Sequence, residues 1–156
     1  MNLPIVKLFV LITLCPSSVA ETFEGNVLHV VDGDTLTLSE GDDVHRIRLS
    51  EIDTPEMDQP WGREAKAALI AKVYGAAIKV VVVDTDRYGR KVAKIWVGER
   101  DINRELVREG HAWVYERYLI DKTLLDDQAT AKSAAVGLWR RIKVIPPWQW
   151  RARAAE

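Results

Sequence analysis

The feature of the sequence that most constrains the fold is a series of short β-branched segments between residues 23 and 53, each separated by turn residues. Valine, isoleucine and threonine favour strands, and they dominate residues 27–31, 35–38 and 44–52. Asp32-Gly33 lies between the first two segments. Asp-Gly between such runs is a strong hairpin signal, because glycine tolerates positive φ. The chain is therefore expected to begin as an antiparallel meander.

Further helices and strands are expected downstream from the spacing of apolar residues. Ala65, Leu69 and Val73 recur every four residues after Pro60, and they predict a helix over residues 61–73. Later apolar segments predict strands over 77–83 and 92–97, a short helix over 102–107 and a longer helix over 122–136 with Asp121 as its N-cap.

These elements predict one α+β domain over residues 21–156, dominated by a small β-barrel. Five short strands with an inserted helix and a helical C-terminal half favour a five-stranded barrel of the oligonucleotide-binding (OB) type, capped by about three helices. A chain of 156 residues, 47% of them hydrophobic, can bury one core of this size. Because Pro146 and Pro147 cannot continue a helix, residues 141–156 are expected to form an extended basic tail.

The first 20 residues have the layout of a secretory signal peptide, with Lys7, an apolar run over residues 8–14 and small residues ending at Ala20. The apolar run is shorter than the roughly 20 residues that a membrane span requires. Cleavage before Glu21 would remove Cys15, the one cysteine, so the mature domain would have no disulfide and no thiol nucleophile. We therefore expect an exported protein, periplasmic or extracellular, that is not held in a membrane after cleavage.

The net charge gives little support to a polyanionic partner. It is −1 for the whole chain and −2 once residues 1–20 are removed, because Lys7 is the only charged side chain among them. The tail, however, is locally basic. Its cations could form a binding patch or a solvated charge run: Arg140, Arg141, Lys143, Arg151 and Arg153.

Four carboxylates lie at the predicted strand ends: Asp32, Asp34, Asp53 and Glu56. Such groups repel one another unless a cation joins them. Hard oxygen donors with no histidine or cysteine nearby favour calcium or magnesium over zinc, and a flexible mixture of carboxylate, carbonyl and water suits calcium better. Asp32-Gly33-Asp34 alone is weak support for a metal site, because most Asp-Gly turns bind nothing.

Two arginines could bind a phosphodiester beside these carboxylates. Arg48 precedes Asp53 by five residues, and Arg90 comes from the turn between the last two strands. Planar guanidinium groups donate paired hydrogen bonds to phosphate and stabilise the extra negative charge of a pentacoordinate transition state. Either arginine could instead simply pair with a carboxylate. Strict strand alternation would also put Arg48 and Asp53 on opposite faces, so the strand must bend or end between them.

Five ordered blocks of this sequence together resemble the thermonuclease, or staphylococcal nuclease, family over roughly residues 23–140: residues 31–35, 48–49, 52–56, 86–90 and 103–110. Any one block is ambiguous, whereas their order and spacing together are specific. The resemblance implies an OB barrel with three helices, a bound calcium ion, and endonucleolytic hydrolysis of DNA and RNA that leaves 3′-phosphate ends. It also leads us to expect a monomer that prefers single-stranded substrates.

The same resemblance implies a metal site and a general base. Asp34 and Asp53 would supply carboxylates to calcium, Thr54 would supply its backbone carbonyl, and Asp32 would lie just outside the coordination sphere. Glu56 would either take a proton from the attacking water or orient that water. Magnesium could also occupy the site without supporting catalysis.

The resemblance further implies residues that bind the substrate. Arg48 and Arg90 would bind the scissile phosphate and complete the catalytic group with the glutamate. Arg87, Tyr88 and Tyr118 match positions that contact the nucleotide, where aromatic stacking tolerates any base.

This sequence departs from the family pattern at two of these positions. Glu116 replaces a second tyrosine of the binding pocket, and Arg87 stands where the family also uses lysine. The main alternative to catalysis is a barrel of the same ancestry that binds nucleic acid or protein without cutting it. Because Arg48, Glu56 and Arg90 are all present, an active nuclease is favoured.

Overall fold

The computed structural model describes residues 21–154, so the predicted signal peptide lies outside the described residues. The N-terminal part forms a closed barrel of five strands: β1 (Thr22–Val30), β2 (Thr35–Glu40), β3 (Asp43–Leu49), β5 (Ala77–Thr85) and β6 (Lys91–Val97). The sheet order is β3-β2-β1-β5-β6, and a parallel pairing of β3 with β6 closes it. The first three strands pair antiparallel, as predicted. The predicted α+β fold dominated by an OB-type barrel is confirmed.

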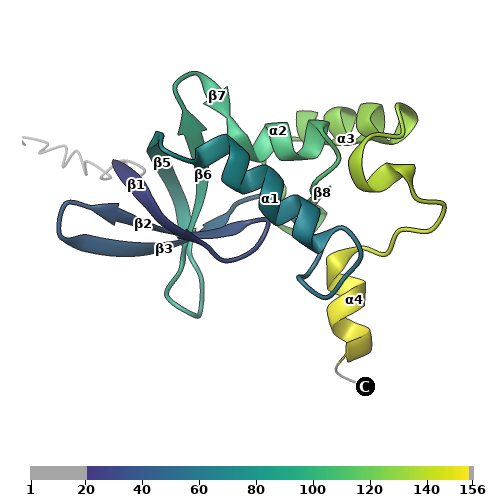
Figure 1. Cartoon of the computed structure of the whole chain (residues 1–156), viewed down its shortest axis with the longest axis horizontal. Coiled ribbons are helices and arrows are strands. Elements are labelled where there is room, and N and C mark those ends of the chain that lie inside the picture. The colour runs from purple at the N-terminus through teal and green to yellow at the C-terminus, as the bar shows by residue number, and fades with distance from the viewer. Residues whose placement is uncertain (1–20, 155–156) are drawn as a thin grey trace, which may run out of the picture.

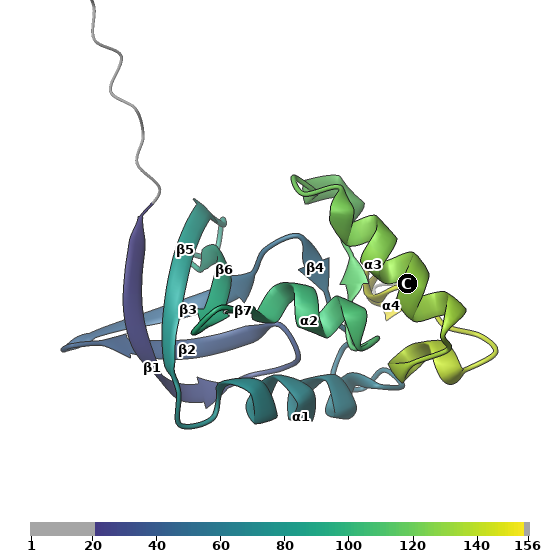
Figure 2. The same ribbon diagram turned by 90° about the horizontal axis from the view of Figure 1, so that it is seen from above.

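Helices and very short strands complete the described part of the chain. The helices are α1 (Gly62–Val73), α2 (Ile102–Arg108), α3 (Thr123–Ser133) and α4 (Pro147–Ala154), with short 3-10 helices η1 (Glu116–Tyr118) and η2 (Gly137–Arg140). The two-residue strands are β4 (Ile52–Asp53), β7 (Arg100–Asp101) and β8 (Trp113–Val114). The barrel occupies one half of the molecule, and α2, α3 and α4 occupy the other (Figure 1). Seen from above, α1 runs along one flank (Figure 2).

The prediction of an extended tail over residues 141–156 is wrong for Pro147–Ala154, which form helix α4. Pro147 is the first residue of this helix, where the missing backbone N–H would have no intrahelical partner and the fixed φ suits the helix. The backbone N–H groups of Gln149 and Trp150 donate to the carbonyl oxygen of Pro146 (3.0 and 3.1 Å). Proline thus starts a helix here, and the barrel is accompanied by four helices instead of about three.

A single core joins the barrel to the helices. Ala65, Leu69 and Val73 form the buried face of α1, as their four-residue spacing predicts. Leu69 and Val73 belong, with apolar residues of the strands and of α2, to one buried cluster that extends to Leu124 of α3, and Ala65 is fully buried as well. Helix α3 begins at Thr123 and ends three residues earlier than predicted. Its N-cap is Lys122 and not the predicted Asp121, although Asp121 Oδ1 accepts the backbone N–H of Thr123 (3.0 Å).

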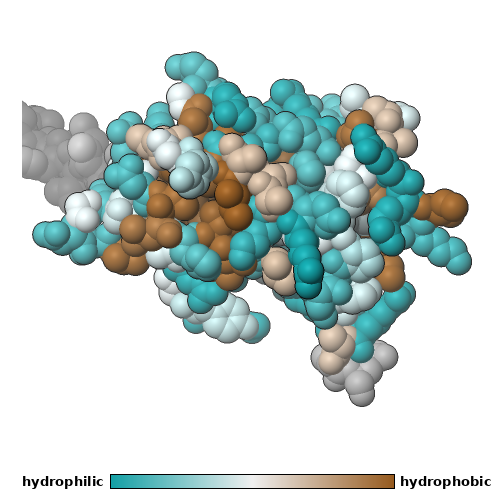
Figure 3. All heavy atoms as spheres, viewed as in Figure 1, coloured by the Kyte–Doolittle hydropathy of each residue, from teal (hydrophilic) through white to brown (hydrophobic). Residues whose placement is uncertain are grey.

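Charged side chains cover much of the helical half. Lys72 of α1 forms ion pairs with Glu105 (2.9 Å) and Glu109 (2.7 Å), and Arg100 pairs with Glu105 (2.5 Å). We call these four residues the helical cluster. In the view of Figure 3, hydrophobic residues gather over the barrel strands, whereas the helical half is mostly hydrophilic. None of the described helices combines the length and hydropathy that a membrane span requires.

Candidate active site

The hairpin between β1 and β2 places Asp34 at the edge of the barrel. The backbone N–H of Val31 donates to the Thr35 carbonyl (2.8 Å), which closes the predicted turn. Gly33 does not have the positive φ that the hairpin signal suggested. Its role is close packing, because a Cβ at this position would lie 2.7 Å from Thr54 Oγ1 and 2.8 Å from the Cβ of Ala65. The turn therefore packs against the residues that follow β4.

Asp34 is a buried carboxylate with a full set of donors, being 1% exposed. Its Oδ2 accepts from the backbone N–H (2.7 Å) and the hydroxyl (2.9 Å) of Thr54, and its Oδ1 accepts from Arg48 and the hydroxyl of Thr35 (3.2 Å). Burial raises the pKa of Asp34 above its ordinary value, although Arg48 opposes this. Asp32 lies beside it, accepting the Asp34 backbone N–H (3.1 Å) and adding negative charge.

A sharp turn after β3 brings Arg48 and Asp53 to the same side of the chain. Strand β3 ends at Leu49, and Glu51 adopts φ 64°, so strand alternation is interrupted before β4. The buried Glu51 side chain holds this turn. Its Oε1 accepts the backbone N–H groups of Ile120 (2.7 Å) and Asp121 (2.6 Å).

Two further contacts fix the same turn to β6. The Glu51 carboxylate pairs with Lys94 (2.8 Å), and Lys94 and these backbone donors lower the pKa of Glu51 although burial opposes them. Asn103, fully buried at the start of α2, donates to the carbonyls of Ser50 (3.0 Å) and Ala93 (3.2 Å) and accepts from Ile95 N–H (3.1 Å). Sequence reasoning missed Glu51, because a glutamate in a polar turn has no distinguishing local signal.

Arg48 bridges the two buried aspartates. One terminal nitrogen donates to Asp34 Oδ1, and Nη2 donates to Asp53 Oδ1 (2.5 Å). Although burial alone would lower it, the Asp34 and Asp53 carboxylates raise the pKa of Arg48, so its charge is fixed. The structure therefore brings Asp34, Arg48, Asp53 and Thr54 together.

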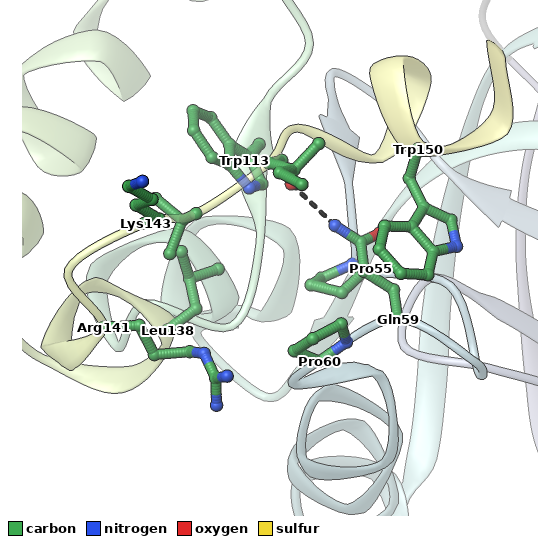
Figure 4. A pocket seen from close by; sticks show the side chains of 10 residues that line it. Pro55, Gln59, Pro60, Trp113, Leu138, Arg141, Lys143 and Trp150 are labelled. Atoms are coloured by element: carbon green, nitrogen blue, oxygen red, sulfur yellow. Dashed lines mark hydrogen bonds between the residues drawn. The ribbon is translucent and has the colours of Figure 1, made fainter. Parts of the chain in front are cut away.

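Glu56 follows on a compact loop before α1. Its backbone N–H donates to Gln59 Oε1 (3.1 Å), and its carbonyl accepts from the Gln59 backbone N–H (2.9 Å). Gly62 lies against the same carbonyl, and a Cβ at this position would approach it to 1.8 Å. The Gln59 side chain also donates to the carbonyl of Ile145 (2.6 Å), which ties the loop to the C-terminal segment (Figure 4). The position of Glu56 thus depends on contacts distant in sequence.

A third arginine, which sequence reasoning did not assign to the site, reaches these carboxylates from α4. Arg151 Nη1 donates to Glu56 Oε1 (2.6 Å), and Nη2 donates to Asp53 Oδ2 (2.8 Å). The available signal was Pro147 followed by a helix with arginines in its last turn. The two guanidinium groups link three carboxylates, and we call these five residues the site cluster: Asp34, Arg48, Asp53, Glu56 and Arg151.

Arg90 lies on the neighbouring turn between β5 and β6. The parallel pairing of β3 with β6 sets Arg48 opposite Val92, two residues after Arg90. The Arg90 guanidinium donates to Asp86 Oδ2 (2.7 Å) and lies 5.6 Å from the ring centre of Tyr88. Thus the turn places Arg90 next to the site, paired with its own carboxylate.

The other predicted substrate residues are exposed around this edge. Tyr88 is 68% exposed, and its hydroxyl accepts from Arg87 (2.6 Å). Tyr118 is 59% exposed and packs edge-on against Tyr115, with ring centres 5.2 Å apart. Glu116 occupies η1 with Tyr118 and is exposed. Both tyrosine side chains are therefore largely exposed, although the Arg87 guanidinium lies over the Tyr88 ring (4.8 Å) and the Arg117 guanidinium lies over the Tyr118 ring (5.6 Å).

The oxygens that could bind a metal are separated by guanidinium groups. Across residues 21–154, no three carboxylate, imidazole or thiol groups are close enough together to hold a metal ion directly. Asp34 and Asp53 nevertheless share Arg48, and Asp53 and Glu56 share Arg151. The donors are hard oxygens held around positive charge, which fits calcium or magnesium in chemical type.

Comparison with known proteins gives consistent results. The family model described as staphylococcal nuclease homologue matches residues 46–141, a range that ends before α4. An uncharacterized endonuclease of Haemophilus influenzae is 34% identical over 148 residues, covering 94% of this chain and 83% of that protein. An uncharacterized endonuclease of Escherichia coli O157:H7 is 38% identical over 130 residues, covering 83% and 85%.

A plant protein is also similar over a shorter region. The probable staphylococcal-like nuclease CAN1 of Oryza sativa subsp. japonica is 40% identical over 107 residues, which cover 69% of this chain and 32% of that protein. The barrel topology, the family match and the bacterial relatives all indicate the same family. This chain therefore belongs to the staphylococcal nuclease family, and it is a nuclease, a hydrolase acting on ester bonds.

Proposed function

We propose that this chain is an exported, calcium-dependent endonuclease that hydrolyses phosphodiester bonds of DNA and RNA and leaves 3′-phosphate ends. The observation that carries the proposal is the convergence of Asp34, Arg48, Asp53 and Glu56 at one edge of the barrel. Arg90 lies on the adjacent turn. These groups provide hard oxygens for a cation, a carboxylate for proton transfer and two guanidinium groups for phosphate.

The chain's own residues have distinct parts in this reaction. Asp34, Asp53 and the carbonyl of Thr54 would hold calcium, which when bound polarises a phosphoryl oxygen and orients water. Glu56 takes a proton from the attacking water or orients it, which contributes about 10²–10⁴-fold. Its side chain is 35% exposed, so water can reach it.

The two predicted arginines act on the phosphate. Arg48 and Arg90 donate hydrogen bonds to the equatorial oxygens, whose negative charge grows in the transition state. Their charge-assisted bonds are strongest where water is excluded, and both side chains are largely covered, at 19% and 22% exposed. Attack of water on phosphorus with departure of the 5′ oxygen leaves a 3′-phosphate.

The exposed aromatic residues favour single-stranded nucleic acid as substrate. Tyr88 and Tyr118 are largely exposed, and unpaired bases could stack on their rings without sequence preference once the arginine side chains over those rings move aside. Arg87 lies over the Tyr88 ring (4.8 Å) and supplies positive charge for the backbone. We also propose a monomer in the periplasm or outside the cell, and mass spectrometry of the exported protein would then find Glu21 as its first residue.

Degradation of denatured DNA and of RNA by the purified protein, with calcium and with a chelator, tests the proposal. The variants are Arg48→Ala, Glu56→Gln and Arg90→Ala, with Arg100→Ala of the helical cluster as the matched control. We expect calcium-dependent cutting, products ending in 3′-phosphate, and losses on the order of 10²-fold or more for the arginine variants of the site. Cutting in the chelator would overturn the metal assignment. Near-normal rates for Arg48→Ala would overturn the role of that arginine.

A further inference from the structure

Helix α4 is held beside the active site by its two tryptophans. The Trp148 ring stacks on Tyr115 at 5.3 Å and 12°, and it meets the Trp113 ring edge-on at 5.8 Å. Trp150 donates from its ring nitrogen to Asp58 Oδ1 (3.2 Å). Trp150 lines a pocket together with Pro55 and Gln59, which precede and follow Glu56 in the sequence (Figure 4). Helix α4 therefore packs in a defined position against the loop that contains Glu56.

The packing of α4 places the Arg151 side chain in the site cluster. Arg151 donates to both oxygens of Asp53, at 2.8 Å to Oδ2 and 3.2 Å to Oδ1, and to Glu56 Oε1 at 2.6 Å. Burial alone would lower the pKa of Arg151, but the hydrogen bonds to Asp53 and Glu56 raise it. Charge-assisted hydrogen bonds of this kind are among the stronger polar contacts in proteins.

We propose that Arg151 is a further residue of the active site, which occupies the cation position between Asp53 and Glu56 and competes with the divalent metal for the Asp53 carboxylate. This inference rests on the proposed function, because it takes calcium as the competitor. Arg151 takes up lone pairs on both oxygens of Asp53, and a metal ion bound by this carboxylate would need at least one of these oxygens. Binding of the metal therefore requires that Arg151 withdraw.

Arg151, and not Arg48, is the arginine that gives way. The Arg48 side chain is 19% exposed and comes from strand β3 of the barrel, whereas the Arg151 side chain is 42% exposed and comes from the last helix. Withdrawal of Arg151 into water needs only a change in its side chain. Displacement of Arg48 would leave its buried guanidinium without partners, which costs far more.

Titration calorimetry with calcium alone, without substrate, tests this competition. The variants are Arg151→Ala and Arg151→Lys, and the matched control is Arg153→Ala, which removes the same charge from the same helix at an exposed position. We expect the dissociation constant for calcium to fall about tenfold or more in Arg151→Ala, to fall less in Arg151→Lys, and to stay unchanged in Arg153→Ala. A lysine keeps the charge, but its single ammonium cannot bridge both carboxylates as a guanidinium does.

Thermal unfolding gives a second, independent readout. In the presence of a chelator, Arg151→Ala should unfold at a lower temperature than the wild type, because Asp53 and Glu56 lose a counter-charge. At saturating calcium the two curves should converge. Arg153→Ala should follow the wild type in both conditions, and circular dichroism confirms that each variant is folded.

The outcomes separate this inference from the proposed function. Calcium affinity that is equal in the wild type, Arg151→Ala and Arg153→Ala overturns the competition and leaves the nuclease mechanism intact. An equal gain of affinity in Arg151→Ala and Arg153→Ala also overturns it, because the effect would then be one of net charge. Failure of every variant to bind calcium overturns the calcium assignment itself, together with this inference.

Discussion

The site cluster and the helical cluster are built from the same kinds of side chain but differ in burial. In the site cluster Asp34 and Asp53 are buried, and burial raises the pKa of Asp34 even though Arg48 lies against it. In the helical cluster the hydrogen bond from Arg100, with help from Lys72, lowers the pKa of Glu105 to about 2 although burial opposes them. Arg100 and Lys72 thus favour the ionised form of Glu105, whereas burial disfavours the ionised form of Asp34 despite the hydrogen bonds that it accepts.

This contrast agrees with the proposed role of the site cluster in catalysis. A buried carboxylate with a raised pKa gains most from an additional cation, and perturbed groups of this kind concentrate where chemistry occurs. The carboxylates of the helical cluster already have satisfied partners and face solvent. The predictions below test the contrast at matched positions, from the largest expected effect to the smallest.

The largest difference in the effect of a substitution on the rate of hydrolysis is expected between the two bridging cations, Arg48 and Lys72. Each pairs with two carboxylates. Arg48→Ala should lower the rate of nucleic-acid hydrolysis on the order of 10²-fold or more, because it removes a donor to the transition state. Lys72→Ala should leave the rate unchanged and cost about 1 kcal/mol of stability. Steady-state rates and urea unfolding measure both, and similar losses of activity would show that the contrast is wrong.

Calcium should stabilise the protein only through the site cluster. At a free concentration about 100 times its dissociation constant, calcium should raise the free energy of unfolding by about 2.7 kcal/mol. Asp53→Asn should lose most of this increment, because it removes a charged ligand. Glu105→Gln should retain it. Urea unfolding with calcium and with a chelator measures this increment in each variant. If calcium stabilised both variants equally, it would not bind at Asp53.

Acid should weaken the helical cluster over a defined pH range. The pKa of Glu105 is lowered from its ordinary value of 4.5 to about 2 in the folded protein. Its ionised form is therefore favoured by folding, so the stability it contributes is complete above pH 4.5 and is lost as the pH falls toward 2. Glu105→Gln should cost about 1–2 kcal/mol at pH 7, after allowance for screening by solvent. Urea unfolding across this pH range measures the difference in unfolding free energy between the wild type and Glu105→Gln. A difference at pH 2 as large as that at pH 7 would contradict this account.

The smallest effect is expected at Glu109, whose side chain is 50% exposed. Glu109→Gln removes one exposed partner of Lys72 and should change stability by no more than about 0.5 kcal/mol. The rate of hydrolysis should be unaffected. Thermal unfolding at low and high salt checks the first expectation, and a change well above this limit would mean that Lys72 depends on both partners.

Much of the barrel could be predicted from the sequence, because local pattern decides strands and turns. The β-branched segments gave five strands close to their observed positions, and the four-residue spacing of Ala65, Leu69 and Val73 gave the buried face of α1. The order and spacing of five sequence blocks over residues 31–110 gave the resemblance to the family that the comparisons confirm. The roles of these residues in catalysis remain predictions.

The parts that sequence reasoning missed depend on contacts between distant residues. Gly33 was interpreted as a turn residue with positive φ, but its role is to let the hairpin pack against Thr54. Glu51 is held by Lys94 and by the backbone of Ile120. Pro147 was interpreted as part of an extended tail because proline cannot continue a helix, whereas it begins α4. A proline is compatible with both roles, and the surrounding packing selects one.

The sequence by itself determined the kind of fold and the identity of the charged groups, because hydrophobic periodicity and ordered motifs are local properties of the chain. Only the tertiary structure decided how these charges meet. The left-handed turn at Glu51 brings Arg48 onto Asp53, and helix α4 brings Arg151 to the same carboxylate from 98 residues away. Burial and distance set the electrostatic state of a carboxylate, and neither exists until the chain has folded.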